Sequence, residues 1–156
     1  MMKITYRQAY DKLAAEGIRM THQRQLILTF LYEKSLSHPS AEALFDAIYA
    51  EHPRVVSRPT VYKNLHLLQS FDLLKALYIG HNPVARYDIH VLPHHHLHCL
   101  HCGSVSDYEG SLPMAHSAIP GFRAEQVYME ISGVCEACQR LQRTAAKQEE
   151  AMALAM

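Results

Sequence analysis

The sequence lacks any hydrophobic run long enough to cross a membrane. A spanning helix needs roughly 18 consecutive apolar residues, and no segment of this 156-residue chain approaches that length. The chain begins Met1-Met2-Lys3 and becomes polar at once, without the apolar stretch of a signal peptide. These absences exclude a membrane protein and predict a cytoplasmic location.

Motifs that mark several enzyme classes are also missing. The sequence contains no H-E-x-x-H pair of metalloproteases, no Walker A loop and no G-x-G-x-x-G nucleotide-binding loop. No histidine is followed two residues later by glutamate, as the zinc deaminases require. The protein is therefore not expected to be an enzyme.

Charged residues are few, and their signs cancel. They make up 19% of the chain against 49% hydrophobic residues, which excludes disorder over most of its length. Residues 1–85 contain ten Lys or Arg and seven Asp or Glu, whereas residues 86–156 contain five and eight. This difference is small enough to arise by chance. It also fits an anionic ligand on the first half and cations on the second.

The first half has the pattern of a helical domain that ends in a hairpin. Four Ser or Thr residues can cap helices, and each is followed by apolar residues at helical spacing. These capping residues are Thr5, Thr21, Ser40 and Ser57. Two short apolar runs, residues 73–79 and 84–89, then flank a cluster of turn-forming residues and predict a β-hairpin. Helices followed by such a hairpin describe a winged helix-turn-helix.

The fourth predicted helix carries side chains that suit DNA. In a winged helix-turn-helix this helix enters the major groove, where basic, phenolic and amide groups contact phosphates and base edges. The side chains of this kind are Arg58, Tyr62, Lys63 and Asn64. A solvated helix surface has a similar composition, so both interpretations stay open on this evidence.

Two C-x-x-C pairs form the strongest local pattern. Cys99 and Cys102 are separated from Cys135 and Cys138 by 32 residues. Two such pairs give a tetrahedral four-thiolate site in which Zn²⁺ is coordinatively closed, so we predict a structural zinc site. A redox-active thiol pair and an iron–sulfur centre use the same residue type and remain alternatives.

A run of histidines, His94-His95-His96-Leu97-His98, precedes the first cysteine pair. Side chains alternate along a strand, so His95 is expected to point away from the other three imidazoles. Two imidazoles together with Asp88 and Asp107 offer nitrogen and oxygen ligands that suit Fe²⁺ or Mn²⁺. A solvated strand edge or a nonspecific metal trap has the same composition.

Taken together, these segments resemble the ferric uptake regulator family of bacterial metal-dependent repressors over nearly the whole chain. The matching segments are residues 17–21 with Arg24, residues 38–41, 60–65 and 86–88, the histidine run and both cysteine pairs. The resemblance implies an α+β fold, with an N-terminal winged helix-turn-helix domain and a small α/β dimerisation domain. It also implies a structural Zn²⁺ and a regulatory metal at the hinge between the domains.

The resemblance further implies domain boundaries and partners. The DNA-binding domain is expected at residues 1–85, a hinge at 86–93, the dimerisation domain at 94–143 and a helical or frayed tail at 144–156. A homodimer is expected to bind palindromic, A/T-rich double-stranded operator DNA. Thr60 belongs to the recognition-helix motif, and the family pattern puts Arg19 near the minor groove.

The regulatory site implied by the resemblance takes Fe²⁺ or Mn²⁺. Its ligands would be His38, Asp88, His94, His96 and Asp107. Aspartate at positions 88 and 107, where iron-sensing members usually have glutamate, resembles the peroxide-responsive branch. In that branch bound Fe²⁺ reacts with hydrogen peroxide, a ligand histidine is oxidised and the operator is released. The histidines of this chain that match the oxidised ligands are His38 and His94. With Mn²⁺ in the same site, the protein would repress without being oxidised.

Two alternatives follow from the same residues. A regulator of iron or zinc uptake would respond to metal level only, and a metal-buffering protein would bind metal without selecting DNA. A further metal site found in many iron-sensing members is not expected, because only one of its matching positions is a good ligand. These positions are Pro93, His95, Met114 and Val127, and His98, His101 and His116 match no family role.

Overall fold

The computed structural model describes the chain except for residues 1–2, 35, 81, 111–119, 124–127 and 155–156. Three residues discussed above, Met114, His116 and Val127, lie outside the described part. The chain divides into two compact units, Met1–Pro93 and His94–Met156. Within the described residues, no helix combines the length and the apolar character needed to span a membrane.

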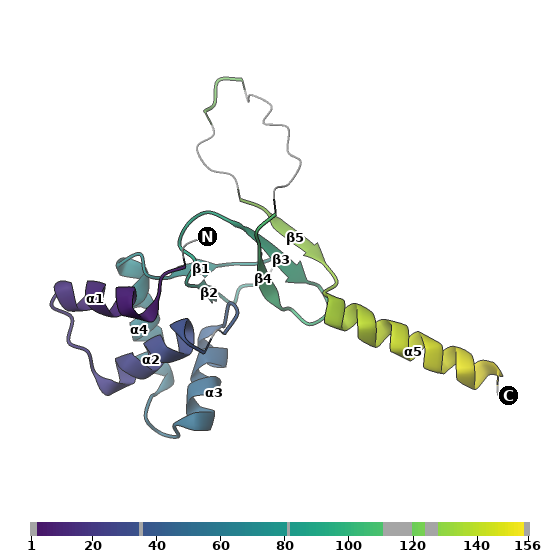
Figure 1. The fold of residues 1–156 in the computed structure, drawn as a ribbon, viewed down its shortest axis with the longest axis horizontal. Coiled ribbons are helices and arrows are strands. Elements are labelled where there is room, and N and C mark those ends of the chain that lie inside the picture. The colour runs from purple at the N-terminus through teal and green to yellow at the C-terminus, as the bar shows by residue number, and fades with distance from the viewer. Residues whose placement is uncertain (1–2, 35, 81, 111–119, 124–127, 155–156) are drawn as a thin grey trace. The chain divides into compact units, whose positions relative to one another are not determined.

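In the described part of the N-terminal unit, four helices begin where the capping residues predict. They are α1 (Tyr6–Ala15), α2 (His22–Tyr32), α3 (Ala41–Glu51) and α4 (Arg58–Ser70) (Figure 1). In each case the side chain of the predicted Ser or Thr accepts the backbone N–H three residues further on. These side chains satisfy N–H groups that the first helical turn leaves without a partner.

The apolar stripes of the four helices meet in one core. Their central side chains are fully buried: Leu13, Ile27, Leu44, Ile48, Val61 and Leu65. The strands β1 (Lys75–Leu77) and β2 (Arg86–Asp88) pair antiparallel, and Tyr87 of β2 joins this core. The strands are shorter than the predicted apolar runs, because Leu73 and Leu74 are already buried in the helical core before β1 begins. The structure also places residues 86–88, the start of the predicted hinge, in the hairpin.

The described residues of the C-terminal unit form a three-stranded sheet followed by one long helix. Strand β3 (His95–Cys99) lies between β4 (Val105–Tyr108), which is antiparallel to it, and β5 (Glu130–Gly133), which is parallel. Helix α5 (Glu136–Leu154) follows β5. Helices and a mixed sheet in this order confirm the predicted α+β class.

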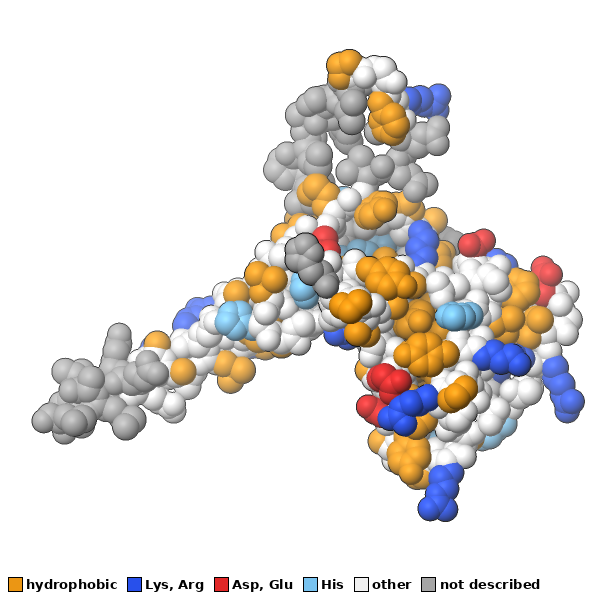
Figure 2. Space-filling view, turned by 180° about the vertical axis from the view of Figure 1, so that it is seen from behind, with side chains coloured by type: hydrophobic (Ala, Val, Ile, Leu, Met, Phe, Trp, Pro, Cys, Tyr) orange, Lys and Arg blue, Asp and Glu red, His pale blue; other side chains and the backbone are white. Residues whose placement is uncertain are grey.

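Helix α5 is open to solvent over most of its described length. Side chains from Gln139 to Gln148 are all exposed, including Leu141 at 71%. Figure 2 shows hydrophobic side chains open along this helix, which is the arm that ends in grey atoms. An isolated helix of this kind gains little stability in water without packing against another surface.

Candidate metal centres and nucleic-acid interface

The parallel pairing of β3 and β5 brings the two cysteine pairs together. Cys99 ends β3 opposite Gly133, the last residue of β5, and Cys135 follows two residues later at the start of α5. The Gly133 carbonyl accepts the N–H of Leu100 at 2.8 Å and fixes this junction. As a result the sulfur atoms of all four cysteines lie within 4.8 Å of one another.

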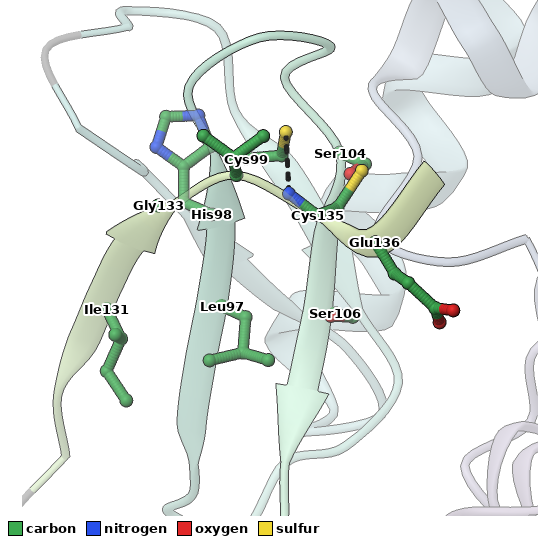
Figure 3. A pocket seen from close by; sticks show the side chains of 10 residues that line it. Leu97, His98, Cys99, Ser104, Ser106, Ile131, Gly133, Cys135 and Glu136 are labelled. Atoms are coloured by element: carbon green, nitrogen blue, oxygen red, sulfur yellow. Dashed lines mark hydrogen bonds between the residues drawn. The ribbon is translucent and has the colours of Figure 1, made fainter. Parts of the chain in front are cut away.

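Hydrogen bonds prepare some of these thiols for metal binding. The backbone N–H groups of Cys102 and Cys135 donate to the Cys99 sulfur and lower the pKa of the Cys99 thiol to about 5. The second of these bonds is 3.3 Å long (Figure 3). A hydrogen bond with the Ser104 hydroxyl lowers the pKa of the Cys102 thiol. The hydrogen bond with the Cys135 thiol, together with burial, raises the pKa of Cys138 to about 12.

The four sulfurs fit a metal ion that takes a closed thiolate shell. All four cysteines are free thiols, so none is used in a disulfide. Four thiolates match the donor set of structural zinc and leave no coordination position open for chemistry. The hydrogen bonds stabilise negative charge at Cys99 and Cys102, whereas Cys138 keeps its proton until a cation offsets the charge of its neighbours.

Zinc uptake by the reduced, zinc-free protein is therefore expected to release protons. At pH 7 the Cys138 thiol is mostly protonated in the folded unit, where its pKa is raised to about 12, and also in an unfolded one, where a cysteine thiol has a pKa of about 8.5. It must therefore lose its proton to ligate. Its proton competes with zinc more strongly as the pH falls, so the affinity should decrease toward acid pH. Titration calorimetry in two buffers of different ionisation enthalpy measures the release. An identical heat in both buffers would contradict the expectation.

A cavity of about 310 Å³ lies beside the cysteines on one face of the sheet. Leu97, Ser106 and Ile131 line it from three adjacent strands, and Leu97 and Ile131 lie side by side in Figure 3. Because side chains alternate along a strand, His96 and Asp107 lie on the opposite face. The sheet therefore has one partly apolar face, beside which the cysteines lie, and an opposite face that carries His96 and Asp107.

In the N-terminal unit, His38 and Asp88 form a buried pair. The Nε2 atom of His38 lies 3.7 Å from Oδ1 of Asp88, and the Nδ1 atom lies 3.2 Å from the Ser37 hydroxyl. His38 has a backbone φ of +46°, which is uncommon for a residue other than glycine. This conformation gives the two side chains an arrangement that can share one cation.

Strand β2 holds the His38 segment in place. The backbone N–H of Tyr87 donates to the Pro39 carbonyl at 2.9 Å, so that β2 runs beside residues 38–39. Asp88 follows in the same strand, and its Oδ1 accepts the N–H of His90 at 2.7 Å. Burial, together with the nearby phenols of Tyr62 and Tyr78, raises the pKa of Tyr87. The hairpin thus carries Asp88, lies beside His38, and places Tyr87 in the core to which α4 contributes Val61 and Leu65.

In the C-terminal unit, a second group of ligands gathers on one face of the sheet. His96 of β3 is opposite Asp107 of β4. The Nε2 atom of His94 lies 3.2 Å from Oδ1 of Asp107, and the rings of His94 and His96 are 4.3 Å apart. One ligand atom from each of these three residues lies within 4.8 Å of the others. Two imidazoles and a carboxylate suit Fe²⁺, Mn²⁺ or Zn²⁺.

The other histidines of this region have different neighbours. His95 points away from this group, as the strand alternation predicts, and its Nδ1 accepts the N–H of Met129 at 3.2 Å. His98 Nδ1 lies 3.5 Å from Oε1 of Glu130. His101 lies between the first two cysteines and contacts Gln142 of α5 at 2.9 Å.

The exposed face of α4 carries two of the side chains expected to contact DNA. Tyr62 is 42% exposed and Lys63 is also exposed. Thr60 lies in the first turn, where its hydroxyl is 2.8 Å from that of the capping residue Ser57. Arg19 is exposed in the segment between α1 and α2. These positions leave Tyr62, Lys63 and Arg19 accessible to a duplex.

Arg58 has partners within the protein that the sequence did not predict. Its Nε donates to Oε2 of Glu42 at 2.6 Å, and a second nitrogen is 3.8 Å from Oδ1 of Asp46. Its guanidinium also lies 4.2 Å from the centre of the Phe45 ring. Arg58 therefore anchors the start of α4 to α3, and a phosphate must compete with two carboxylates to bind it.

Asn64 differs from the prediction because it lies on the inner side of α4. It is only 6% exposed, and its amide oxygen accepts the Nε–H of Arg24 at 2.8 Å. A base edge cannot reach this amide in the described conformation. Arg24 is one of the residues that carry the family resemblance, but the resemblance implies no role for it. Arg24 pairs with Asn64, which is 40 positions away, so no local sequence pattern indicates this contact.

A family model described as the ferric uptake regulator family matches residues 15–132 of the chain. Among curated proteins, the peroxide operon regulator of Bacillus subtilis strain 168 is 30% identical over 138 residues, which are 86% of this chain and 93% of that protein. The peroxide-responsive repressor PerR of Staphylococcus aureus strain Mu50 is 32% identical over 136 residues, which are 85% and 90% of the two chains.

A similar fold occurs among solved structures. The ferric uptake regulator Fur of Helicobacter pylori, described as having three functional metal binding sites, aligns with a TM-score of 0.66. The alignment covers 89% of this chain and 97% of that chain at 22% identity. At this identity the likeness establishes the fold alone.

Proposed function

The chain belongs to the ferric uptake regulator family, and we propose that it is a repressor that senses hydrogen peroxide. Members of the family are metal-responsive regulators of transcription, so the protein is not an enzyme. The observation that carries the proposal is that the carboxylates beside two of the candidate ligand histidines are both aspartates, Asp88 beside His38 and Asp107 beside His94. The names of the two curated relatives support the same branch.

The proposed regulatory site takes ligands from both units. His38 and Asp88 would come from the N-terminal unit, and His94, His96 and Asp107 from the C-terminal unit. Three imidazoles and two carboxylates suit Fe²⁺ and Mn²⁺. A cation that needs ligands from both units stabilises only the arrangement in which those ligands meet. We propose that this arrangement binds the operator.

Peroxide sensing would act through the ligands themselves. With Fe²⁺ bound, one oxygen atom of hydrogen peroxide would enter a C–H bond of a ligand imidazole and the other would leave as water. The imidazole would supply the two electrons, and Fe²⁺ would catalyse the transfer. Ser37 and Asp88 hold the His38 ring on both sides, which keeps the imidazole in the site. Oxidation of His38 or His94 removes one nitrogen ligand, and the chain loses the interaction that selects its DNA-binding arrangement.

The remaining assignments are proposed on the same basis. The four cysteines would hold a structural Zn²⁺, and residues 94–143 would form the dimerisation domain after a hinge at 86–93. Exposed apolar side chains on the sheet and on α5, such as Leu97 and Leu141, support a homodimer formed by this unit. The dimer would bind a palindromic, A/T-rich duplex, to which Tyr62, Lys63 and Arg19 are accessible.

Mass spectrometry separates peroxide sensing from a response to metal level only. After the iron-loaded protein is treated with mild hydrogen peroxide, peptides that contain His38 or His94 are expected to gain the mass of one oxygen atom. The manganese-loaded protein, treated in parallel, should show no such gain. If both forms stay unmodified while metal still controls DNA binding, the protein is a regulator of metal uptake.

A gel shift separates both regulators from a metal-buffering protein. Repressors of either kind should retard a selected duplex in the presence of Mn²⁺ and release it when the ion is removed. A buffering protein should show no preference among duplexes with or without Mn²⁺. The histidine run alone favours neither outcome, because it suits both functions.

A further inference from the structure

The side chain of Arg24 joins two segments that are expected to read DNA. Its Nε donates to the amide oxygen of Asn64 in α4 at 2.8 Å, and one of its terminal nitrogens donates to the backbone carbonyl of Arg19. Its own backbone N–H donates to Oγ1 of the capping residue Thr21 at 3.3 Å. Arg24 is thus fixed at the start of α2 while its guanidinium reaches both neighbours.

Asn64 uses both ends of its amide in this arrangement. The oxygen accepts from Arg24, and the nitrogen donates to the Thr60 carbonyl one turn earlier in α4, at 2.8 Å. A buried amide that loses one of these partners keeps the cost of desolvation without the hydrogen bond. The amide and the guanidinium therefore hold each other in one orientation.

The two connected segments have their side chains directed to solvent. Arg19 is exposed in the segment between α1 and α2, and Tyr62 and Lys63 are exposed on α4. Nothing in the sequence keeps these segments at a fixed separation, since about 40 residues lie between them. The guanidinium of Arg24 is a planar fork of donors and can bridge two acceptors at a defined spacing, which a lysine ammonium does not do.

We propose that Arg24 and Asn64 are positioning residues, which set the Arg19 segment relative to the recognition helix so that both contact one half-site at once. The inference rests on the proposed DNA-binding function. When the two segments already have the correct separation in the free protein, less conformational entropy is lost on binding. The resulting gain in affinity appears only on a duplex that both segments contact. Non-operator DNA, which is bound through its phosphates alone, should gain nothing.

The experiment uses duplexes chosen by the protein itself. Manganese-loaded wild-type protein selects from a random-sequence duplex library, and the winning duplex is compared with a scrambled one of the same composition. The variants are Asn64→Ala, which changes no charge, and Arg24→Lys, which keeps the charge but replaces the planar guanidinium, with its several donors, by an ammonium group. Each should weaken binding to the selected duplex by about tenfold, because the Arg19 segment and α4 must then be ordered relative to each other when the protein binds. Binding to the scrambled duplex should stay within about twofold, because the charge that contacts phosphate is unchanged.

A double-mutant cycle provides a result that a merely structural role would not give. Arg19→Ala should weaken binding to the selected duplex in wild-type protein, and weaken it much less when Asn64→Ala is already present. Gln23→Ala is the matched control, because Gln23 also joins α2 to a distant segment, through the Val55 carbonyl at 2.9 Å, but does not contact Arg19. The effects of Gln23→Ala and Arg19→Ala should be independent and multiply.

The possible outcomes separate this inference from the proposed function. If the wild-type protein selects no duplex, the DNA-binding proposal is wrong and this inference is wrong with it. If the wild-type protein selects a duplex but Asn64→Ala and Arg24→Lys bind it with unchanged affinity, only the inference is overturned. Independent effects of Arg19→Ala and Asn64→Ala would overturn it as well.

Discussion

His38→Ala is expected to abolish metal-dependent operator binding while the structural zinc stays bound. His38 and Asp88 are the two proposed ligands from the N-terminal unit, and they form a buried pair in which Nε2 and Oδ1 are 3.7 Å apart. Without the imidazole, only one carboxylate connects this unit to the regulatory metal. Manganese then no longer favours the DNA-binding arrangement over others, since a ligand shifts an equilibrium only by its difference in affinity for the two states.

We expect His38→Ala to lower the affinity for Mn²⁺ strongly. Loss of groups that merely orient metal ligands typically costs 10–100-fold in metal affinity, so loss of a ligand should cost at least about 100-fold. Fluorescence anisotropy of a labelled selected duplex, titrated with Mn²⁺, measures the change. His95→Ala is the matched control, because this histidine belongs to the same run but points away from the His94 and Asp107 group. Wild-type manganese dependence in His38→Ala would refute the assignment of this ligand.

Cys138→Ser is expected to unfold most of the C-terminal unit. Among the described residues of this unit, only Cys99 and Val105 are buried hydrophobic side chains. A sheet of three short strands with so small a core depends on another source of stability. Zinc held by four thiolates supplies about 10–16 kcal/mol in small zinc domains, which is comparable to the whole stability of a typical domain, about 5–15 kcal/mol.

The loss should be confined to one unit. The N-terminal unit has its own core, formed by helices α1 to α4 and Tyr87, and should keep its helical circular dichroism and its cooperative unfolding. Zinc content, size-exclusion chromatography and thermal unfolding of Cys138→Ser follow the two units separately. Removing zinc from the wild-type protein with a chelator and adding it back provides the control. A zinc-free protein that remains dimeric, with an intact C-terminal unit, would contradict a structural role for the metal.

The features that sequence predicts well are those determined by local interactions. A capping residue and its target N–H are three positions apart, so Thr21 and Ser40 mark the starts of α2 and α3 without knowledge of the fold. The alternation of a strand likewise separates His95 from His96. The cysteine pairs are 32 residues apart, but the coordination chemistry of four thiolates predicts that they meet, and the pairing of β3 with β5 brings them together.

The features that sequence does not predict depend on partners from distant segments. Arg58 and Asn64 are polar residues of the recognition helix, and both are residue types that commonly contact DNA. Arg58 instead pairs with Glu42 of α3, and Asn64 accepts from Arg24 of α2. Whether a polar side chain faces solvent or a neighbouring helix depends on how α2, α3 and α4 pack, which no local pattern contains. The place of His38 beside β2 also depends on a distant partner, because the Tyr87 N–H donates to the carbonyl of Pro39, the residue after His38.

The most direct test of peroxide sensing compares the iron- and manganese-loaded proteins on the same selected duplex. Operator binding is measured before and after a brief exposure to hydrogen peroxide, which is then removed with catalase. The proposed mechanism predicts that the iron-loaded protein releases the duplex and does not rebind it when fresh metal is added, whereas the manganese-loaded protein stays bound. Retention of the duplex by the iron-loaded protein, or equal release by both forms, would contradict it.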